Sequence, residues 1–276
     1  MAANLKDRLG QKVGDLHVKQ EEQKIVAIPN AAPTTLSEYT ALTTNALEII
    51  NENLKNQPLS QQVFDVVKAP SGGTTVFTIP GVGGEELHKE ITGIILDYGT
   101  PRAYWKSVDP VEGNPPDCYS RNGLTSYKGA SCSLCPFNEF GSSQKSDSNA
   151  KACKEMVELY LLRPDNIMPL IVRIPVSSKR IFQKYMVRLV SNMIPVCGVV
   201  TKITLEKATS RAGQPYAKYV FEAVREIGPE ETERAKAFGQ KFSEILREAA
   251  RLEDEAAGNK GNRCFVSAHK GNGTQD

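Results

Sequence analysis

The sequence predicts an α+β protein with a mainly β core, an OB-like Greek-key barrel interrupted by a cysteine-rich insert and flanked by helices. Three observations support this class: short runs of β-branched and aromatic residues, a polar stretch with four cysteines, and helical periodicity near both ends. The 276 residues can bury one sizeable core. We expect an N-terminal arm and helix at 1–57, a core at 58–225, and an acidic amphipathic helix with a disordered tail at 226–276.

The N-terminal region is expected to form a polar arm and then one helix. Residues 1–24 are polar and show no clear period. Helical spacing runs over 35–54, where one face collects Leu36, Tyr39, Leu47, Ile50 and Leu54. Pro58 ends this helix.

The period changes to two in the first half of the core. Strand-like runs occupy 62–70, 74–81 and 90–107, and the turn residues between them include a glycine-rich loop at 81–84. The third run must bend if it is one element, and Gly99 with Pro101 marks the expected bend.

The second half of the core follows the cysteine-rich stretch. Strands are expected at 156–164, 168–175, 197–209 and 216–224, with a helix at 177–193 and a hairpin loop at 210–215. Cys197 lies in one of these strands and should be a core residue. A final helix at 229–258 carries acidic residues in its first turn and a stripe with Phe238 and Phe242, and Gly258 ends it.

Four of the six cysteines have the spacing Cys118-x13-Cys132-x2-Cys135-x17-Cys153. A Cys-x-x-Cys pair lets two thiolates converge on one ion, and two more complete the tetrahedron of a structural zinc site. Zinc would also supply the folding free energy that so polar a stretch lacks. We therefore predict a four-cysteine zinc insert at 118–153 with structural Zn²⁺. An iron–sulfur cluster, a redox Cys-x-x-Cys pair and a chance grouping are the alternatives.

Aromatic and basic residues alternate in three parts of the chain. Such side chains can stack bases and neutralise phosphates, and each stacked base contributes about 1–3 kcal/mol whatever its identity. The alternative is that the rings fill local cores. If strand alternation holds, Tyr98, Tyr104 and Lys106 share one face. The candidates for nucleic-acid binding are Tyr98, Arg102, Tyr104, Trp105, Lys106, Tyr119, Arg121, Tyr127, Lys128, Arg211, Tyr216 and Lys218.

The charge distribution indicates a polyanionic partner. The net charge is only +2, but basic residues at 173–225 far outnumber Glu206 and Glu222, and acidic residues dominate after Arg225.

Other chemistries find little support. The motif "GVGGEE" has Glu86 where a dinucleotide fingerprint needs glycine, and the three histidines are scattered. We therefore predict that the protein is not an enzyme. No apolar run reaches the ~18 residues of a membrane span, and the N-terminus has no secretory h-region, so a cytoplasmic location is expected.

The order of these motifs resembles one protein family. The four cysteines with the flanking "CPFNEFGS", followed by the strand-to-helix junction "IPVSSKRIFQKY", are similar to phage and mobile-element single-stranded DNA-binding proteins of the helix-destabilising type. In these proteins an OB-fold carries a zinc subdomain. The resemblance implies a protein that coats and protects single strands in replication and recombination, and that recruits replication proteins through an acidic C-terminal region. Here the last residues, "HKGNGTQD", are not acidic. Two roles are therefore open for the acidic helix: it contacts replication proteins in place of the tail, or it simply packs on the barrel through its Phe238 and Phe242 stripe.

The expected function is therefore sequence-independent binding of single-stranded DNA by a basic aromatic groove, in the host cytoplasm if a phage encodes the chain. The sequence gives no oligomeric state. The alternatives are a zinc-stabilised transcription or assembly factor that acts mainly through protein partners, and an enzyme whose active residues the sequence does not reveal.

Overall fold

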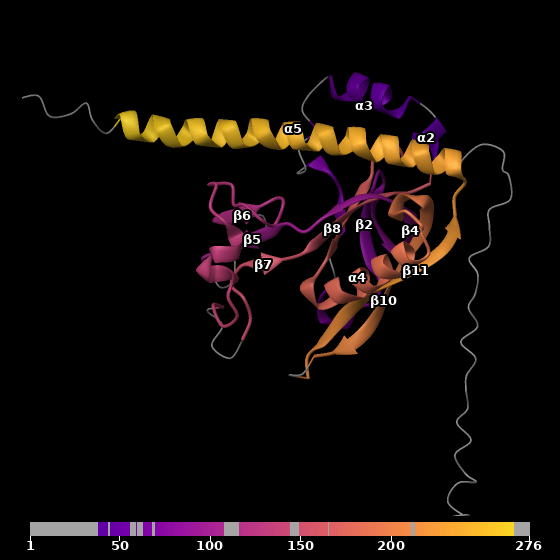
Figure 1. Ribbon diagram of the computed structural model, residues 1–276, viewed down its shortest axis with the longest axis horizontal. Coiled ribbons are helices and arrows are strands. Elements are labelled where there is room, and N and C mark those ends of the chain that lie inside the picture. Colours follow the sequence, from indigo (N-terminus) through magenta and orange to yellow (C-terminus); the bar gives the residue numbers. More distant parts are fainter. Residues whose placement is uncertain are drawn as a thin grey trace, which may run out of the picture.

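The computed structural model describes residues 38–43, 45–55, 59, 63–67, 70–107, 116–143, 149–164, 166–210 and 213–267, with the backbone alone for 253–267. A six-stranded mixed sheet forms the middle layer (Figure 1). Helix α4 (Val176–Ser191) covers one face, and the long helix α5 (Pro229–Ser267) lies across the other. The class is α+β, as predicted.

The sheet is open rather than closed. Its strand order is β1-β9-β8-β4-β10-β11, with β1 parallel to β9 and every other neighbouring pair antiparallel. Within the described residues its two edges, β1 and β11, do not pair, so the predicted closed barrel is not formed. The next two strands along the chain, at 77–81 and 84–88, pair only with each other among the described residues and do not bridge these edges. The strands are β1 (Val66–Val67), β4 (Glu90–Gly99), β8 (Val157–Leu162), β9 (Leu170–Ile174), β10 (Val199–Thr209) and β11 (Pro215–Glu226).

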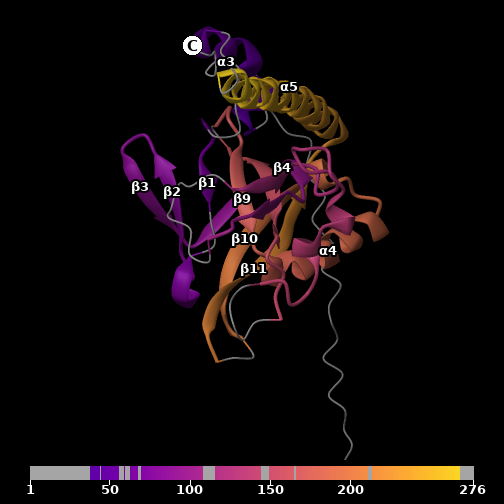
Figure 2. The ribbon, with the colours of Figure 1, turned by 90° about the vertical axis from the view of Figure 1, so that its left-hand side faces the viewer.

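A separate hairpin stands beside β1 (Figure 2). It consists of β2 (Phe77–Gly81) and β3 (Gly84–His88). Phe77 of β2 is fully buried, and its ring centroid lies 5.7 Å from that of Tyr219. Strand β3 is not predictable from periodicity, because its first four residues are all exposed and show no apolar alternation.

Helix α4 packs on the sheet through an aromatic face. Its buried residues Phe182, Tyr185 and Leu189 belong to the same core cluster as the sheet residues Ile95 and Ile203. The Tyr185 hydroxyl lies 2.8 Å from the Thr201 hydroxyl, so this buried polar group is satisfied. The helix predicted at 177–193 is therefore confirmed.

Helix α5 packs on the opposite face. Phe238 and Ala235 cluster with Ile94, whereas the next strand residue, Ile95, faces α4. This alternation is the period of two that defines a strand with both faces covered. One turn further along α5, Phe242 meets the edge of Phe64, with ring centroids 5.3 Å apart.

Several element boundaries differ from those expected. The helix expected at 35–54 appears as two described pieces, α2 (Thr40–Thr43) and α3 (Ala46–Leu54). Gly258 does not end α5, which continues to Ser267, because one helical glycine costs only about 1 kcal/mol relative to alanine. Cys197 is buried as expected but lies in a short 3-10 turn, η5 (Val196–Gly198), and not in a strand.

Some expectations fall on other parts of the chain. The arm expected at 1–24, Arg211 and residues 268–276 lie outside the described residues. In the part of the chain that is described, no helix combines the length and apolar character that crossing a membrane requires.

The docking of α5 can be tested by removing one ring. Phe242→Ala should lower the free energy of unfolding by about 3–5 kcal/mol, because it leaves a cavity between Phe64, Tyr160 and the helix. Leu252→Ala, on the same helix but exposed, is the control and should change stability by under ~1 kcal/mol. Urea unfolding measures both, and equal losses would contradict the packing described.

Candidate nucleic-acid interface

The cysteine-rich stretch forms a small subdomain built on three short strands. The chain leaves the main sheet after β4 and enters β5 (Arg102–Tyr104), which pairs with β6 (Cys118–Ser120) and β7 (Lys154–Glu155). The long run at 90–107 therefore breaks between Gly99 and Arg102, as the glycine and proline predicted. Two 3-10 turns, η3 (Cys132–Leu134) and η4 (Pro136–Asn138), complete the insert.

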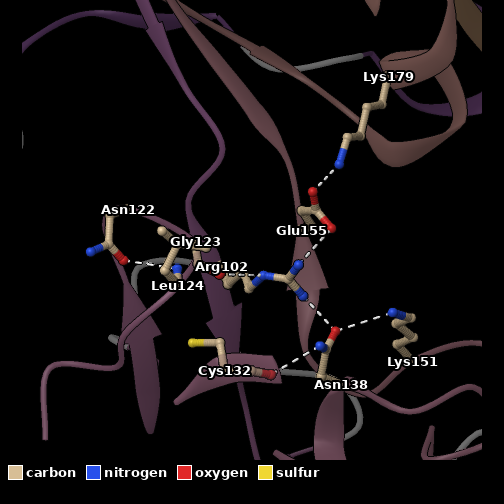
Figure 3. A network of polar contacts seen from close by, with 9 residues as sticks. All are labelled: Arg102, Asn122, Gly123, Leu124, Cys132, Asn138, Lys151, Glu155 and Lys179. Atoms are coloured by element: carbon tan, nitrogen blue, oxygen red, sulfur yellow. Dashed lines mark hydrogen bonds and ion pairs between the residues drawn. The ribbon is translucent and has the colours of Figure 1, made fainter. Parts of the chain in front are cut away.

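Arg102 is the centre of a polar network inside the insert (Figure 3). Its Nε donates to the Gly123 carbonyl at 2.9 Å, Nη1 donates to Asn138 Oδ1, and Nη2 lies 3.1 Å from Glu155 Oε2. The Arg102 and Glu155 side chains are only 16% and 17% exposed. Charge-assisted hydrogen bonds in such a partly dehydrated place are stronger than in water. One guanidinium thus joins β5 to a loop, to η4 and to β7.

Glu155 also joins the insert to the main body. Its second carboxylate oxygen, Oε1, accepts from Lys179 Nζ of α4 (Figure 3). Asn138 makes a further link, because its amide donates to the Cys132 carbonyl at 2.9 Å and its Oδ1 accepts from Lys151 at 3.1 Å. The sequence did not single out Glu155, Asn138 or Lys179. The sequence feature that could have indicated Glu155 is its position just after Cys153, the last of the clustered cysteines.

The loop after β6 is shaped by short-range hydrogen bonds. Asn122 Oδ1 accepts from the backbone N–H groups of Leu124 and Thr125 at 2.8 and 2.9 Å. Gly123 has φ +72°, and a Cβ there would lie 2.4 Å from the Thr100 carbonyl oxygen. Only glycine fits this position, which supplies the carbonyl that Arg102 binds.

The four clustered cysteines line one cavity of about 80 Å³. They share its walls with the aromatic residues Tyr104, Tyr119 and Phe137. Among the described residues, however, no group of three or more His, Cys, Asp or Glu side chains has an arrangement that could hold a metal ion. The predicted zinc site is therefore wrong: Cys118, Cys132, Cys135 and Cys153 surround a cavity with ring walls and do not form a ligand set for Zn²⁺.

The thiols of this cavity are poorly suited to nucleophilic chemistry. Burial raises the pKa of Cys153 to about 11, although nearby Arg102 opposes the shift. Burial also raises the pKa of Cys118, and Cys135 and Cys132 add to the increase. The thiolate is the reactive form, so both side chains remain largely protonated and unreactive at neutral pH.

Aromatic rings of the insert stack on one another, and cations cover two of them. Tyr119 and Tyr127 are stacked with ring centroids 4.7 Å apart. The Arg121 guanidinium carbon lies 5.3 Å from the Tyr119 centroid, and Lys128 Nζ lies 5.2 Å from that of Tyr127. A hydrogen bond with Tyr127 raises the pKa of Lys128, so this lysine stays cationic. Each ring of this stacked pair therefore has one cation close to it.

Two further aromatic contacts extend this surface. Tyr104 stacks on Phe137 with centroids 4.2 Å apart, and Phe137 is 40% exposed. Lys151 Nζ lies 4.8 Å from the ring centroid of Phe140, the most exposed ring of the insert at 74%. Two exposed rings, Tyr127 and Phe140, thus each have a lysine beside them, and Arg121 lies beside the half-buried Tyr119.

The remaining candidates do not all join this surface. Tyr98 stays on the main sheet, where its ring meets Phe182 of α4 at 5.3 Å. Tyr98 and Tyr104 therefore belong to different sheets, so the unbroken alternation that would have put them on one face with Lys106 does not hold. Trp105 and Lys106 follow β5 directly.

Two more candidates lie on β11, an edge strand of the main sheet. Lys218 is paired with Glu206 at 2.7 Å, and Tyr216 lies opposite Ala208. Arg102, as shown above, has its guanidinium occupied by protein groups. The structure thus brings together Tyr104, Tyr119, Arg121, Tyr127 and Lys128, but leaves Tyr98, Tyr216 and Lys218 on the main sheet.

A larger cleft, of about 350 Å³, opens where the main sheet, the insert and α5 meet. Arg121 and Asn122 line it from the insert, and Ser243 and Arg247 line it from α5. Its other lining residues are Asp97, Tyr98, Gly99, Pro101, Glu158, Tyr160, Leu246 and Ala250. Arg121 therefore belongs to both the ring surface and the cleft. Sequence reasoning missed Arg247, because it lies on a helix whose charges look like a solvated face.

Comparison with known proteins gives no relative to guide the interpretation. No protein-family model, curated protein or solved structure matches the chain.

The role of Arg102 can be tested by measuring local stability. Arg102→Gln should lower the stability of the insert by about 3 kcal/mol, because Glu155 loses a partly buried partner and the Gly123 carbonyl and Asn138 lose their charged donor. Arg102→Lys should destabilise the insert almost as much as Arg102→Gln does, since an ammonium cannot make the same three contacts. Amide hydrogen exchange should show faster exchange in 118–143 while the main sheet keeps its protection.

Lys128→Gln is the matched control, because it removes an exposed charge of the same insert. If amide exchange is unchanged in Arg102→Gln, or is accelerated equally in both variants, Arg102 is not the centre of the polar network that stabilises the insert.

Proposed function

We propose that this chain binds single-stranded DNA without sequence preference, through the exposed rings and cations of the insert. The observation that carries the proposal is the stacked pair of Tyr119 and Tyr127, with Arg121 close to the first ring and Lys128 close to the second. Rings that are held in place and flanked by cations can stack bases and attract phosphates at the same time. Every base has a flat face, so such a surface binds strands of any sequence.

The stacked pairs explain why the surface suits unpaired bases. Tyr119 and Tyr127 support each other, so neither ring has to be ordered when DNA binds, which lowers the entropic cost. An incoming base would displace the Lys128 ammonium from the ring of Tyr127 and leave it free to pair with a phosphate. A duplex keeps its bases stacked internally and offers no such contact.

The wider role follows from the family resemblance. We expect a protein that coats and protects single strands during replication and recombination. The proposal needs only the insert surface and does not depend on an OB-type barrel. The acidic part of α5 is the proposed contact for replication proteins, because its apolar stripe is buried on the sheet while Glu244 and Glu248 remain exposed.

Fluorescence anisotropy with labelled oligo-dT, against a duplex of equal length at two salt concentrations, tests the function. Binding should favour the single strand and weaken as salt rises. Tyr127→Ala should cost about 1–3 kcal/mol of binding free energy. Lys128→Gln should reduce the salt slope by roughly 0.7, the share of one phosphate contact on a single strand.

Lys89→Gln is the matched control, because it removes one exposed charge outside the insert. It should leave both the affinity and the slope unchanged. Equal affinity for duplex and single strand, or equal effects of the two lysine changes, would refute binding by the insert surface.

A further inference from the structure

The cleft between the sheet, the insert and α5 combines groups of opposite charge. Its arginines come from two separate elements, and its carboxylates come from the main sheet. We propose that this cleft seats one nucleotide of the bound strand, with its phosphate on Arg121 and Arg247 and its base directed toward Asp97 and Ser243. The inference rests on the proposed function and goes beyond it, because it predicts a preference among bases.

The phosphate side of the cleft has two guanidinium groups. A guanidinium presents a fork of N–H donors that matches phosphate oxygens. Arg121 is already held near the Tyr119 ring at 5.3 Å. Arg247 is exposed on α5, and it forms no ion pair with any other residue that the structure describes. A phosphate could therefore pair with Arg247 without breaking an ion pair between Arg247 and another described residue.

The base side of the cleft has hydrogen-bond acceptors in fixed positions. Asp97 Oδ1 accepts from the Tyr98 backbone N–H at 2.8 Å, and Oδ2 accepts from the Ser243 hydroxyl at 2.6 Å. Each carboxylate oxygen has capacity for another donor. The strand pairing is shifted between Ile95 and Asp97, and such bulges re-aim side chains beside functional sites.

These acceptors predict which bases fit. Adenine and cytosine carry an exocyclic amino group that can donate to the Asp97 carboxylate, whereas guanine and thymine carry a carbonyl in the corresponding position. A thymine carbonyl would face a carboxylate and lose its hydrogen bond to water. The cleft should therefore prefer nucleotides with an amino group in that position, although the insert surface itself is indifferent to sequence.

The second carboxylate of the cleft does not repel the phosphate strongly. Glu158 is buried and lies 2.6 Å from Arg173, which offsets its charge. The walls are also rigid, because Tyr160 packs edge-on against Phe242 with centroids 6.0 Å apart. A volume of about 350 Å³ lies near the lower end of the range of about 300–1,000 Å³ for small-ligand sites.

The test titrates dAMP, dCMP and dTMP separately into the isotope-labelled full chain and follows amide chemical shifts by NMR. The wild type should bind dAMP and dCMP at least about fivefold more tightly than dTMP, the effect of one hydrogen bond of ~1 kcal/mol. Arg247→Gln should weaken all three about tenfold through loss of a charge-assisted contact. Asp97→Asn should remove the base preference.

Two further variants make the result unambiguous. Ala250→Trp should fill the cleft and abolish mononucleotide binding, and it tests the site even if Asp97→Asn does not fold. Lys241→Gln is the matched control on the same helix, since Lys241 is exposed and is not among the cleft residues. It should leave all three affinities at the wild-type value.

The outcomes separate this inference from the proposed function. If oligo-dT fails to bind but dAMP binds with the predicted variant effects, the cleft is a nucleotide site and the coating function is refuted. If oligo-dT binds while dAMP does not, or while Arg247→Gln and Lys241→Gln behave alike, the cleft inference is overturned and the function stands.

Discussion

The insert depends on the ion pair between Arg102 and Glu155. Arg102 contacts three separate parts of the insert, and Glu155 also pairs with Lys179 of α4. A segment with so few aliphatic residues has little apolar surface to bury, so hydrogen bonds, including the charge-assisted ones of Arg102, contribute much of its internal order. Removing either partner would leave the other charged and half-dehydrated. The positions of the Gly123 loop, η4 and β7 relative to β5 therefore depend on Arg102.

The main sheet has a different source of stability and gives the insert a fixed base. Its strands are covered by α4 on one face and α5 on the other, and the two faces have separate aromatic clusters. The chain enters the insert from β4 and continues from the insert into β8, so both ends of the insert are anchored on central strands of the sheet. The cleft forms where these strands, the insert and α5 converge. Arg121 belongs to the cleft and to the stacked rings, so one side chain connects the two proposed contacts with DNA.

Sequence patterns predicted the residue types of the candidate site better than their arrangement. Alternating aromatic and basic residues indicated the insert surface, and five of the candidates do gather there or beside it. The pairing of Tyr119 with Tyr127 depends on a loop shaped by Asn122, which no periodicity reveals. The cysteine spacing is compatible with zinc, but spacing along the chain does not fix the directions of the thiols. Their positions around a ring-walled cavity come from the fold of the insert.

The sequence alone determined the α+β class, helix α4, most of the core strands, and the break at Gly99 and Pro101, because local propensity and periodicity act over a few residues. Tertiary structure decided the rest. Among the described residues β2 and β3 pair with each other and do not close the sheet, β3 pairs by hydrogen bonds that carry no apolar signal, and Arg102 points inward to join distant segments. The cleft also belongs to this second group. Its walls come from residues about 150 positions apart, from Asp97 to Ala250, and only packing brings such residues together.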